Sequence, residues 1–138
     1  MTTSEDVPAV LRTFVRQPTV LLRTRKRDGS WVATPVNIAV EGERAYVRTF
    51  DKSGKYKRLR NFDEVRFCPS TFRGEPTGAT VTARSRLLDG DENRHASNLI
   101  ARKHPLLHGV AVPLAHRVMR TKTLHYELTD IREALQES

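Results

Sequence analysis

The sequence predicts an α+β protein built on a small antiparallel β-barrel. Six short segments are rich in β-branched residues or alternate between apolar and polar positions, as strands do. Most consecutive strands are joined by short turns, which suits an antiparallel barrel better than a parallel doubly wound sheet. A chain of 138 residues is typical of one domain, so we expect residues 1–138 to fold as a single unit.

The first half of the chain predicts one helix followed by a three-stranded meander. Apolar residues at helical spacing indicate a helix from about Pro8 to Arg16, which Pro18 ends. The segments TVLLRTR and WVATPVNIAV form a hairpin around Asp28-Gly29, a pair that accepts positive φ at low cost. A second turn, at Gly42, leads into the alternating strand RAYVRTF.

The second half predicts three more strands and three helices. Ser53 is expected to cap a helix from about Gly54 to Asn61, with Leu59 and Phe62 facing inward and the basic side chains facing out. The other elements are the strands EVRFCPS, ATVTARSRLL and KTLHYELT, the helix ENRHASNLIARKH, and a short tail helix IREALQ.

Composition narrows the classes of function. The 24 basic side chains exceed the 16 acidic ones by eight, which indicates an anionic partner without identifying it. Cys68 is the only cysteine, so the chain has no internal disulfide and no CxxC motif. No apolar run approaches the roughly 18 residues of a membrane span, and the first residues do not resemble a secretory signal. We expect a cytoplasmic protein.

Two basic clusters stand out, LLRTRKRDG and DKSGKYKRLRN. In the second, a strand end leads through Ser53 and Gly54 into a helix that begins with lysines and an arginine. The unpaired N–H groups and positive dipole end of a helix N-terminus attract anions, and these cations strengthen that attraction. The alternative is a solvated basic face without a ligand.

Other chemistries lack a motif to support them. The five histidines are scattered, and His104 and His108 lie on either side of Pro105, so we expect no metal site. The chain has no GxSxG, HExxH or P-loop pattern, which disfavours hydrolases and nucleoside triphosphatases. Trp31 could stack on a ligand, but the pattern favours a role in covering the barrel beside the hairpin.

The segment from about Thr19 to Leu128 resembles the pyridoxamine-phosphate-oxidase-like split barrels, and most of all their actinobacterial F420-dependent branch. The resemblance lies in the ordered set RKRDGS, TPV, the strand ending RTF, SGKxKRLRN and TxRGxPTG. It implies a six-stranded split β-barrel with peripheral helices. It also implies a homodimer that binds coenzyme F420, or alternatively FMN, in grooves at the subunit interface. The reduced deazaflavin then delivers a hydride to a small unsaturated organic substrate.

The resemblance also implies which residues bind the cofactor. By this likeness, Thr34, Pro35, Val36 and Asn37 follow the ring system, and Thr49 lies beside them at the end of the next strand. The residues implied to contact the phosphate or tail, or to reach the groove, are Ser53, Lys55, Lys57, Arg58 and, more weakly, Arg73. Without the resemblance, Thr34 to Val36 would be taken for an ordinary edge strand, where proline is tolerated.

No catalytic side chain is assigned, because the cofactor carries the redox chemistry and the protein supplies binding and orientation. The strongly anionic tail of F420 matches the basic helix in charge. Two other classes remain open. One is a cofactor-binding or storage module without turnover. The other is a basic nucleic-acid binder, which is disfavoured because aromatic residues make up only 7% of the chain.

Overall fold

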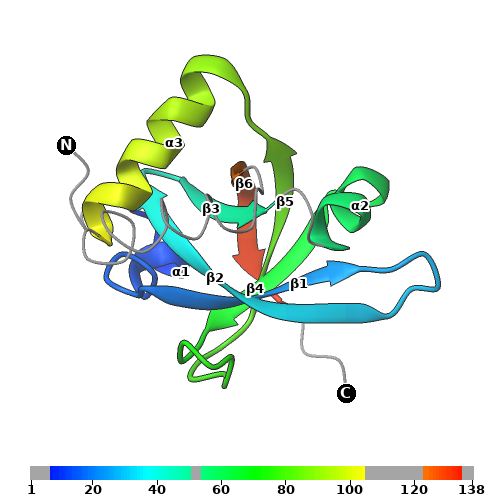
Figure 1. Ribbon diagram of the computed structural model, residues 1–138. Helices are drawn as coiled ribbons and strands as arrows, with labels where there is room; N and C mark the ends of the chain where they lie inside the picture. The colour runs from blue at the N-terminus through cyan, green and yellow to red at the C-terminus, as the bar shows by residue number, and fades with distance from the viewer. Residues whose placement is uncertain (1–6, 51–53, 105–122, 135–138) are drawn as a thin grey trace.

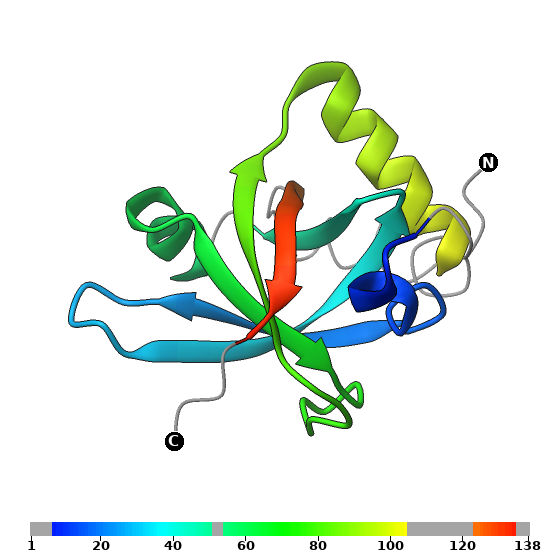
Figure 2. The ribbon, with the colours of Figure 1, turned by 180° about the vertical axis from the view of Figure 1, so that it is seen from behind.

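The computed structural model describes residues 7–50, 54–104 and 123–134. Within these ranges, six antiparallel strands form a closed barrel in the order β1-β2-β3-β6-β5-β4 (Figures 1 and 2). Their bounds are β1 Thr19–Arg25, β2 Trp31–Glu41, β3 Arg44–Phe50, β4 Glu64–Pro69, β5 Val81–Leu87 and β6 Thr123–Glu133. The predicted α+β barrel and its opening meander are confirmed.

In the described parts of the chain, three helices lie around the barrel: α1 (Ala9–Arg12), α2 (Gly54–Asn61) and α3 (Gly90–Lys103). Helix α3 packs along the outside of β2, β3 and β6, at the top of Figure 1. Helix α2 follows β3 in the chain and packs against β1 and β3. None of the described helices is long and apolar enough to cross a membrane.

Strand β2 changes partner along its length. Its residues Trp31–Asn37 pair with β1, and its residues Ile38–Glu41 pair with β3. Among the described strands, none pairs with the other edge of residues 31–36. The barrel is therefore split at this edge, on the side where α2 packs between β1 and β3.

Alternation along the strands separates an inner face from an outer face. The inner face carries the main core, which includes Val20, Leu22, Val36, Ile38, Val47, Val65, Phe67 and Leu128. A smaller core lies under α3 and contains Ala39, Tyr46, Leu88, Ala96 and Ile100. Polar residues on the inner face, such as Thr24 and Thr34, lie toward the split rather than at the centre of the core.

The predicted hairpin turn has the expected geometry. Gly29 adopts φ +91°, and the Lys26 N–H donates to the Ser30 carbonyl 2.8 Å away. Glycine reaches this left-handed region without the steric cost that a side chain brings. The local turn chemistry therefore fixes the register of β1 against β2.

Two predicted helices differ from the structure. Helix α1 ends at Arg12, because the next N–H groups, of Phe14 and Val15, bond three residues back in a tighter turn that leads to Pro18. The predicted tail helix at IREALQ is wrong for its described part, since Ile131 to Glu133 continue β6. There Glu133 pairs with Val81, so the neighbouring strand β5 overrides the local helical pattern.

The bounds predicted for α2 are confirmed, but the orientation of its faces is partly wrong. Leu59 is buried as expected, whereas Phe62 is 36% exposed and Lys55 only 9% exposed. Lys55 precedes Leu59 by four residues, so both lie on the face that packs on the barrel. Phe62 follows the helix end at Asn61 and does not continue that face. Ser53, the expected cap, lies outside the described residues.

Candidate functional site

The open edge of β2 carries a buried polar group without a partner. Thr34 lies on the inner face, opposite Leu22 of β1, and its hydroxyl oxygen has no hydrogen-bond partner among the described residues. Leaving a buried hydroxyl unsatisfied costs about 1–3 kcal/mol, so such a group marks a place where a ligand or partner can supply the bond. The predicted residue Val36 lies on the same face but is buried in the main core.

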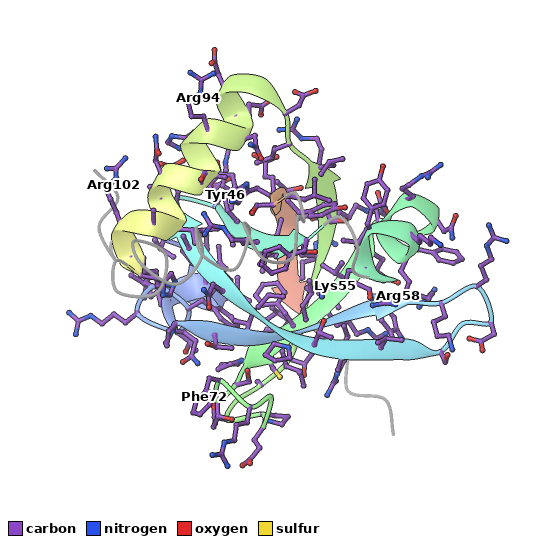
Figure 3. All side chains as sticks on the ribbon, viewed as in Figure 1. Tyr46, Lys55, Arg58, Phe72, Arg94 and Arg102 are labelled. Atoms are coloured by element: carbon purple, nitrogen blue, oxygen red, sulfur yellow. The ribbon has the colours of Figure 1, made fainter. Side chains whose placement is uncertain are left out.

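Helix α2 places two cations beside this inner face. The Arg58 Nε donates to the Thr24 hydroxyl oxygen 2.6 Å away, and Thr24 pairs with Val32, two residues before Thr34. Figure 3 shows Lys55 and Arg58 together on the side of α2 that faces the barrel. Burial lowers the pKa of Lys55, and the charge of Arg58 lowers it further. Burial also lowers the pKa of Arg58.

The Arg58 guanidinium lies against the first turn of its own helix. A Cβ atom on Gly54, the first residue of α2, would lie 2.5 Å from Arg58 Nη1, so glycine leaves the space that this arrangement occupies. A cation near a helix N-terminus is on the unfavourable end of the helix dipole. Lys55, Arg58 and the start of α2 thus concentrate positive charge that an anion would stabilise. The predicted residue Lys57 is exposed on the same helix.

Thr49 is a buried part of the same inner wall. It is 2% exposed and lies next to the end of β3, where its hydroxyl donates to the Phe50 carbonyl 3.3 Å away. It pairs with Leu124 of β6. Thr49 thus lies one residue before the end of β3, and its hydroxyl already has an acceptor.

Pro35 and Arg73 lie on the outer side of β2. Gly74, in the loop after β4, has φ +92° and lies against the side chains of Leu21 and Pro35. A Cβ atom at this position would be within about 4 Å of both side chains. Arg73 is exposed, and its guanidinium lies 5.5 Å from the ring centroid of Phe72. Figure 3 shows Phe72 below the barrel, away from Lys55 and Arg58.

The predicted residues therefore form two groups that share only the open edge of β2. The inner group is Thr34, Val36, Thr49, Lys55 and Arg58. The outer group is Pro35 with the loop of Arg73, while Asn37 is half-buried at the point where β2 changes partner. A flat ligand lying along this edge could touch both groups, whereas a ligand inside the barrel could reach only the first.

Sequence reasoning missed Thr24, which positions Arg58. A signal was present, because Thr24 is a polar residue at an inward position of β1, between Arg23 and Arg25. It also missed that two guanidinium groups lie over the Trp31 ring. The Arg25 and Arg66 Cζ atoms lie 4.6 and 4.8 Å from the Trp31 ring centroid.

A separate polar cluster lies under α3 and holds that helix to the sheet. Arg48 Nε donates to His125 Nε2 at 3.0 Å, and His125 Nδ1 lies 2.8 Å from the Asn93 side-chain oxygen. Glu127 accepts from both Arg44 and Arg86, each at 3.1 Å. Asn93 ties α3 to β6 through His125, and Arg86 of β5 also forms an ion pair with Glu92 of α3.

Comparisons with known proteins rest on structure alone. No family model matches the sequence, and no curated protein matches it. Solved structures match it over most of its length.

Three of these structures illustrate the range. A pyridoxamine 5'-phosphate oxidase-like protein from Listeria innocua has a TM-score of 0.58 at 14% identity, over 91% of this chain and 92% of that one. The F420-H2 dependent reductase FDR-A has a TM-score of 0.56 at 15% sequence identity, and the match covers 81% of this chain and 94% of the reductase. The heme-storage protein HutZ from Vibrio cholerae has a TM-score of 0.58 at 12% sequence identity, and the match covers 90% of this chain and 88% of HutZ.

The six-stranded barrel with its peripheral helices agrees with the resemblance found in the sequence, and the matching structures include both an oxidase-like protein and an F420-H2 dependent reductase. At these identities the agreement concerns the fold. The chain therefore has the split-barrel fold of the pyridoxamine 5'-phosphate oxidase-like proteins.

Proposed function

We propose that this protein is a homodimeric oxidoreductase that binds the deazaflavin coenzyme F420 along the open edge of β2. Reduced F420 would supply the hydride for a small unsaturated organic substrate. The observation that carries this proposal is the concentration of positive charge at the start of α2, where buried Lys55 and the Arg58 guanidinium meet the helix N-terminus. That arrangement suits a phosphate with an anionic tail.

The residues at the open edge fit such a ligand. Thr34 offers a buried hydroxyl that lacks a protein partner among the described residues, and Lys55 and Arg58 offer donors of the right charge. We propose that Thr34, Pro35, Val36, Asn37 and Thr49 border the ring system. The phosphate and tail are assigned to Ser53, Lys55, Lys57 and Arg58, with Arg73 reaching the groove from the outer loop.

In this proposal the chain's own residues bind, orient and exclude water. The Thr24 hydroxyl holds the Arg58 side chain in place, which lowers the entropy lost when the guanidinium binds an anion. Burial of Lys55 strengthens its attraction for a bound negative charge, because the local dielectric constant is lower than that of water. No side chain is assigned a proton-transfer role.

FMN is the alternative cofactor, supported by the fold shared with the oxidase-like protein. Its single phosphate would need only the Lys55 and Arg58 site. A cofactor-binding or storage module without turnover is the alternative function, supported by the fold shared with a heme-storage protein. Catalytic turnover distinguishes the proposed oxidoreductase from such a storage module.

The test is a turnover assay with the full-length protein. Reduced F420 is mixed with the protein and a series of small enones, and the return of the oxidised deazaflavin absorbance is followed. We expect enone-dependent oxidation that is saturable in F420, and a dimer in sedimentation at micromolar protein. Tight binding without oxidation across the series would favour the storage function. A monomer would contradict the proposed subunit groove.

A further inference from the structure

We propose that the tip of the β1–β2 hairpin, at Lys26 and Arg27, binds the outer part of the F420 tail and so selects cofactors with several glutamate residues in that tail. This inference rests on the proposed function, because it extends the site at Arg58 along the hairpin. The tip belongs to the basic cluster LLRTRKRDG, of which the site described above uses only Thr24. Figures 1 and 2 show the hairpin extending past α2, away from the centre of the barrel.

Arg58 connects the proposed phosphate site to the stem of the hairpin. Its Nε donates to the Thr24 hydroxyl at 2.6 Å, and Thr24 is one residue before the end of β1. The Lys26 N–H continues the ladder beyond β1 by donating to the Ser30 carbonyl at 2.8 Å. Because side chains alternate between the two faces of a strand, Lys26 is on the same side of the hairpin as Thr24, about 7 Å further along. A row of anionic groups that starts at Arg58 therefore meets Lys26 next.

The hairpin holds its cations on a preformed frame. At its base, the Arg25 Cζ lies 4.6 Å from the Trp31 ring centroid, and Arg25 pairs with Glu64 of β4 at 3.2 Å. At its tip, Asp28 Oδ1 accepts from the Ser30 N–H at 2.9 Å and from the Ser30 hydroxyl at 2.6 Å. A preformed frame loses less conformational entropy when it binds an anion.

The cations of the tip are available to a ligand. Lys26 and Arg27 are exposed, and neither forms an ion pair within the described parts of the chain. The hydrogen bonds from Ser30 lower the pKa of Asp28, and the charge of Lys26 lowers it further, so Asp28 stays ionised and offsets part of the positive charge. The sequence of α2 contains no acidic residue, so the region between the helix and the hairpin remains positive.

The two flanks of α2 indicate the direction in which the tail runs. Residues two apart in a helix lie on nearly opposite sides, so Arg60 does not share the flank of Arg58. Its Cζ lies 5.8 Å from the Tyr56 ring centroid instead. The flank with Arg58 is the one that contacts β1, so the tail leaves the phosphate site toward the hairpin.

Exposed cations at this position favour a long tail over a short one. A cofactor without glutamate carries its negative charge close to Arg58, whereas each added glutamate brings a carboxylate further along the hairpin. An exposed ion pair strengthens binding about 1.5-fold to fivefold, and about 0.1 M salt screens it beyond roughly 10 Å. Lys26 and Arg27 should therefore affect only the long-tailed cofactor, and mainly at low salt.

The test compares two forms of oxidised F420, one without glutamate and one with at least four, by quenching of deazaflavin fluorescence with the full-length protein at low salt. We expect the parent to bind the long-tailed form at least about tenfold more tightly. The double variant Lys26→Gln/Arg27→Gln should weaken that binding at least about threefold and leave the affinity for the glutamate-free form unchanged. Its sedimentation should match that of the parent, since the hairpin tip is assigned to the tail.

Two further variants make the assignment specific. Asp28→Asn removes the one carboxylate of the tip, and asparagine can still accept from the Ser30 N–H. It should tighten binding of the long-tailed form about twofold. The matched control is Arg94→Gln/Arg102→Gln, which removes the same charge from exposed positions of α3, far from Lys55 and Arg58 in Figure 3. This control should bind both forms as the parent does.

Several results would overturn the proposal. They are equal affinity of the parent for both forms, an unchanged long-tail affinity in Lys26→Gln/Arg27→Gln, an equal loss in the α3 control, or a changed oligomeric state of the hairpin variant. Each of these leaves the proposed oxidoreductase function standing as long as the glutamate-free form binds. Binding of neither form would contradict both the proposed function and this extension of its site.

Discussion

Replacing Lys55 with methionine separates a binding role from a structural one. Lys55 is 9% exposed, and burial and the charge of Arg58 lower its pKa. Its positive charge therefore reduces the stability of the folded protein without ligand. Methionine keeps the apolar stem and removes that charge. We therefore expect the variant to unfold at the same or higher denaturant concentration than the parent, while its affinity for F420 falls.

The size of the loss follows from the kind of contact. A hydrogen bond between a charged donor and an anion contributes about 1.5–3 kcal/mol, which corresponds to a dissociation constant raised about tenfold to a hundredfold. Arg58→Met should lose a similar amount, because its guanidinium also lies at the start of α2. Lys57 is exposed, so water screens its contact with the anion. Its replacement should reduce the free energy of F420 binding by less than about 0.5 kcal/mol, which raises the dissociation constant about twofold.

The assay is quenching of deazaflavin fluorescence at low and high salt, with Arg60→Met as the matched control. Arg60 is exposed on the same helix, and its guanidinium lies over the Tyr56 ring. About 0.5 M salt should weaken parent binding of F420 far more than binding of uncharged riboflavin. If Lys55→Met and Arg58→Met bind F420 as tightly as the parent, the helix is a solvated basic face and the reasoning is wrong.

Three further predictions concern stability and binding at other positions. Burial lowers the pKa of Lys103 to about 8 from 10.5, so the folded state loses this proton first. The free energy of unfolding should consequently increase as pH rises from about 8 to 10.5. Urea unfolding of the parent and of Lys103→Met across this pH range should show the increase only in the parent. Glu127→Gln weakens the bonds from Arg44 and Arg86 and should cost about 1–3 kcal/mol in urea unfolding, and an unchanged midpoint would disprove that role. Thr34→Val removes an unsatisfied hydroxyl and should stabilise the unliganded protein by about 1 kcal/mol while weakening F420 binding. Equal affinity in this variant would remove Thr34 from the site.

Local chemistry made much of the fold predictable. The Asp28-Gly29 turn, the alternation in RAYVRTF and the bounds of α2 depend on interactions between residues close in the chain. The extension of β6 to Glu133 was not predictable in this way, because pairing with β5 decides it. Local propensity gives way to tertiary pairing at such positions.

The candidate site was predictable in composition but not in geometry. The sequence places Lys55, Lys57 and Arg58 on one short helix, yet only packing determines that Lys55 is buried and Lys57 exposed. The anchor of Arg58 on Thr24 joins residues 34 positions apart. The partner change within β2, which opens the edge at Thr34, likewise depends on how the barrel closes.

The most direct test of the central claim is titration of the purified protein with F420 and, separately, with FMN. The account predicts saturable F420 binding with a micromolar or lower dissociation constant that rises with salt, and weaker, less salt-sensitive binding of FMN. Tighter FMN binding would assign the open edge of β2 to a flavin. Binding of neither cofactor would contradict the claim that this edge and the start of α2 form a cofactor site.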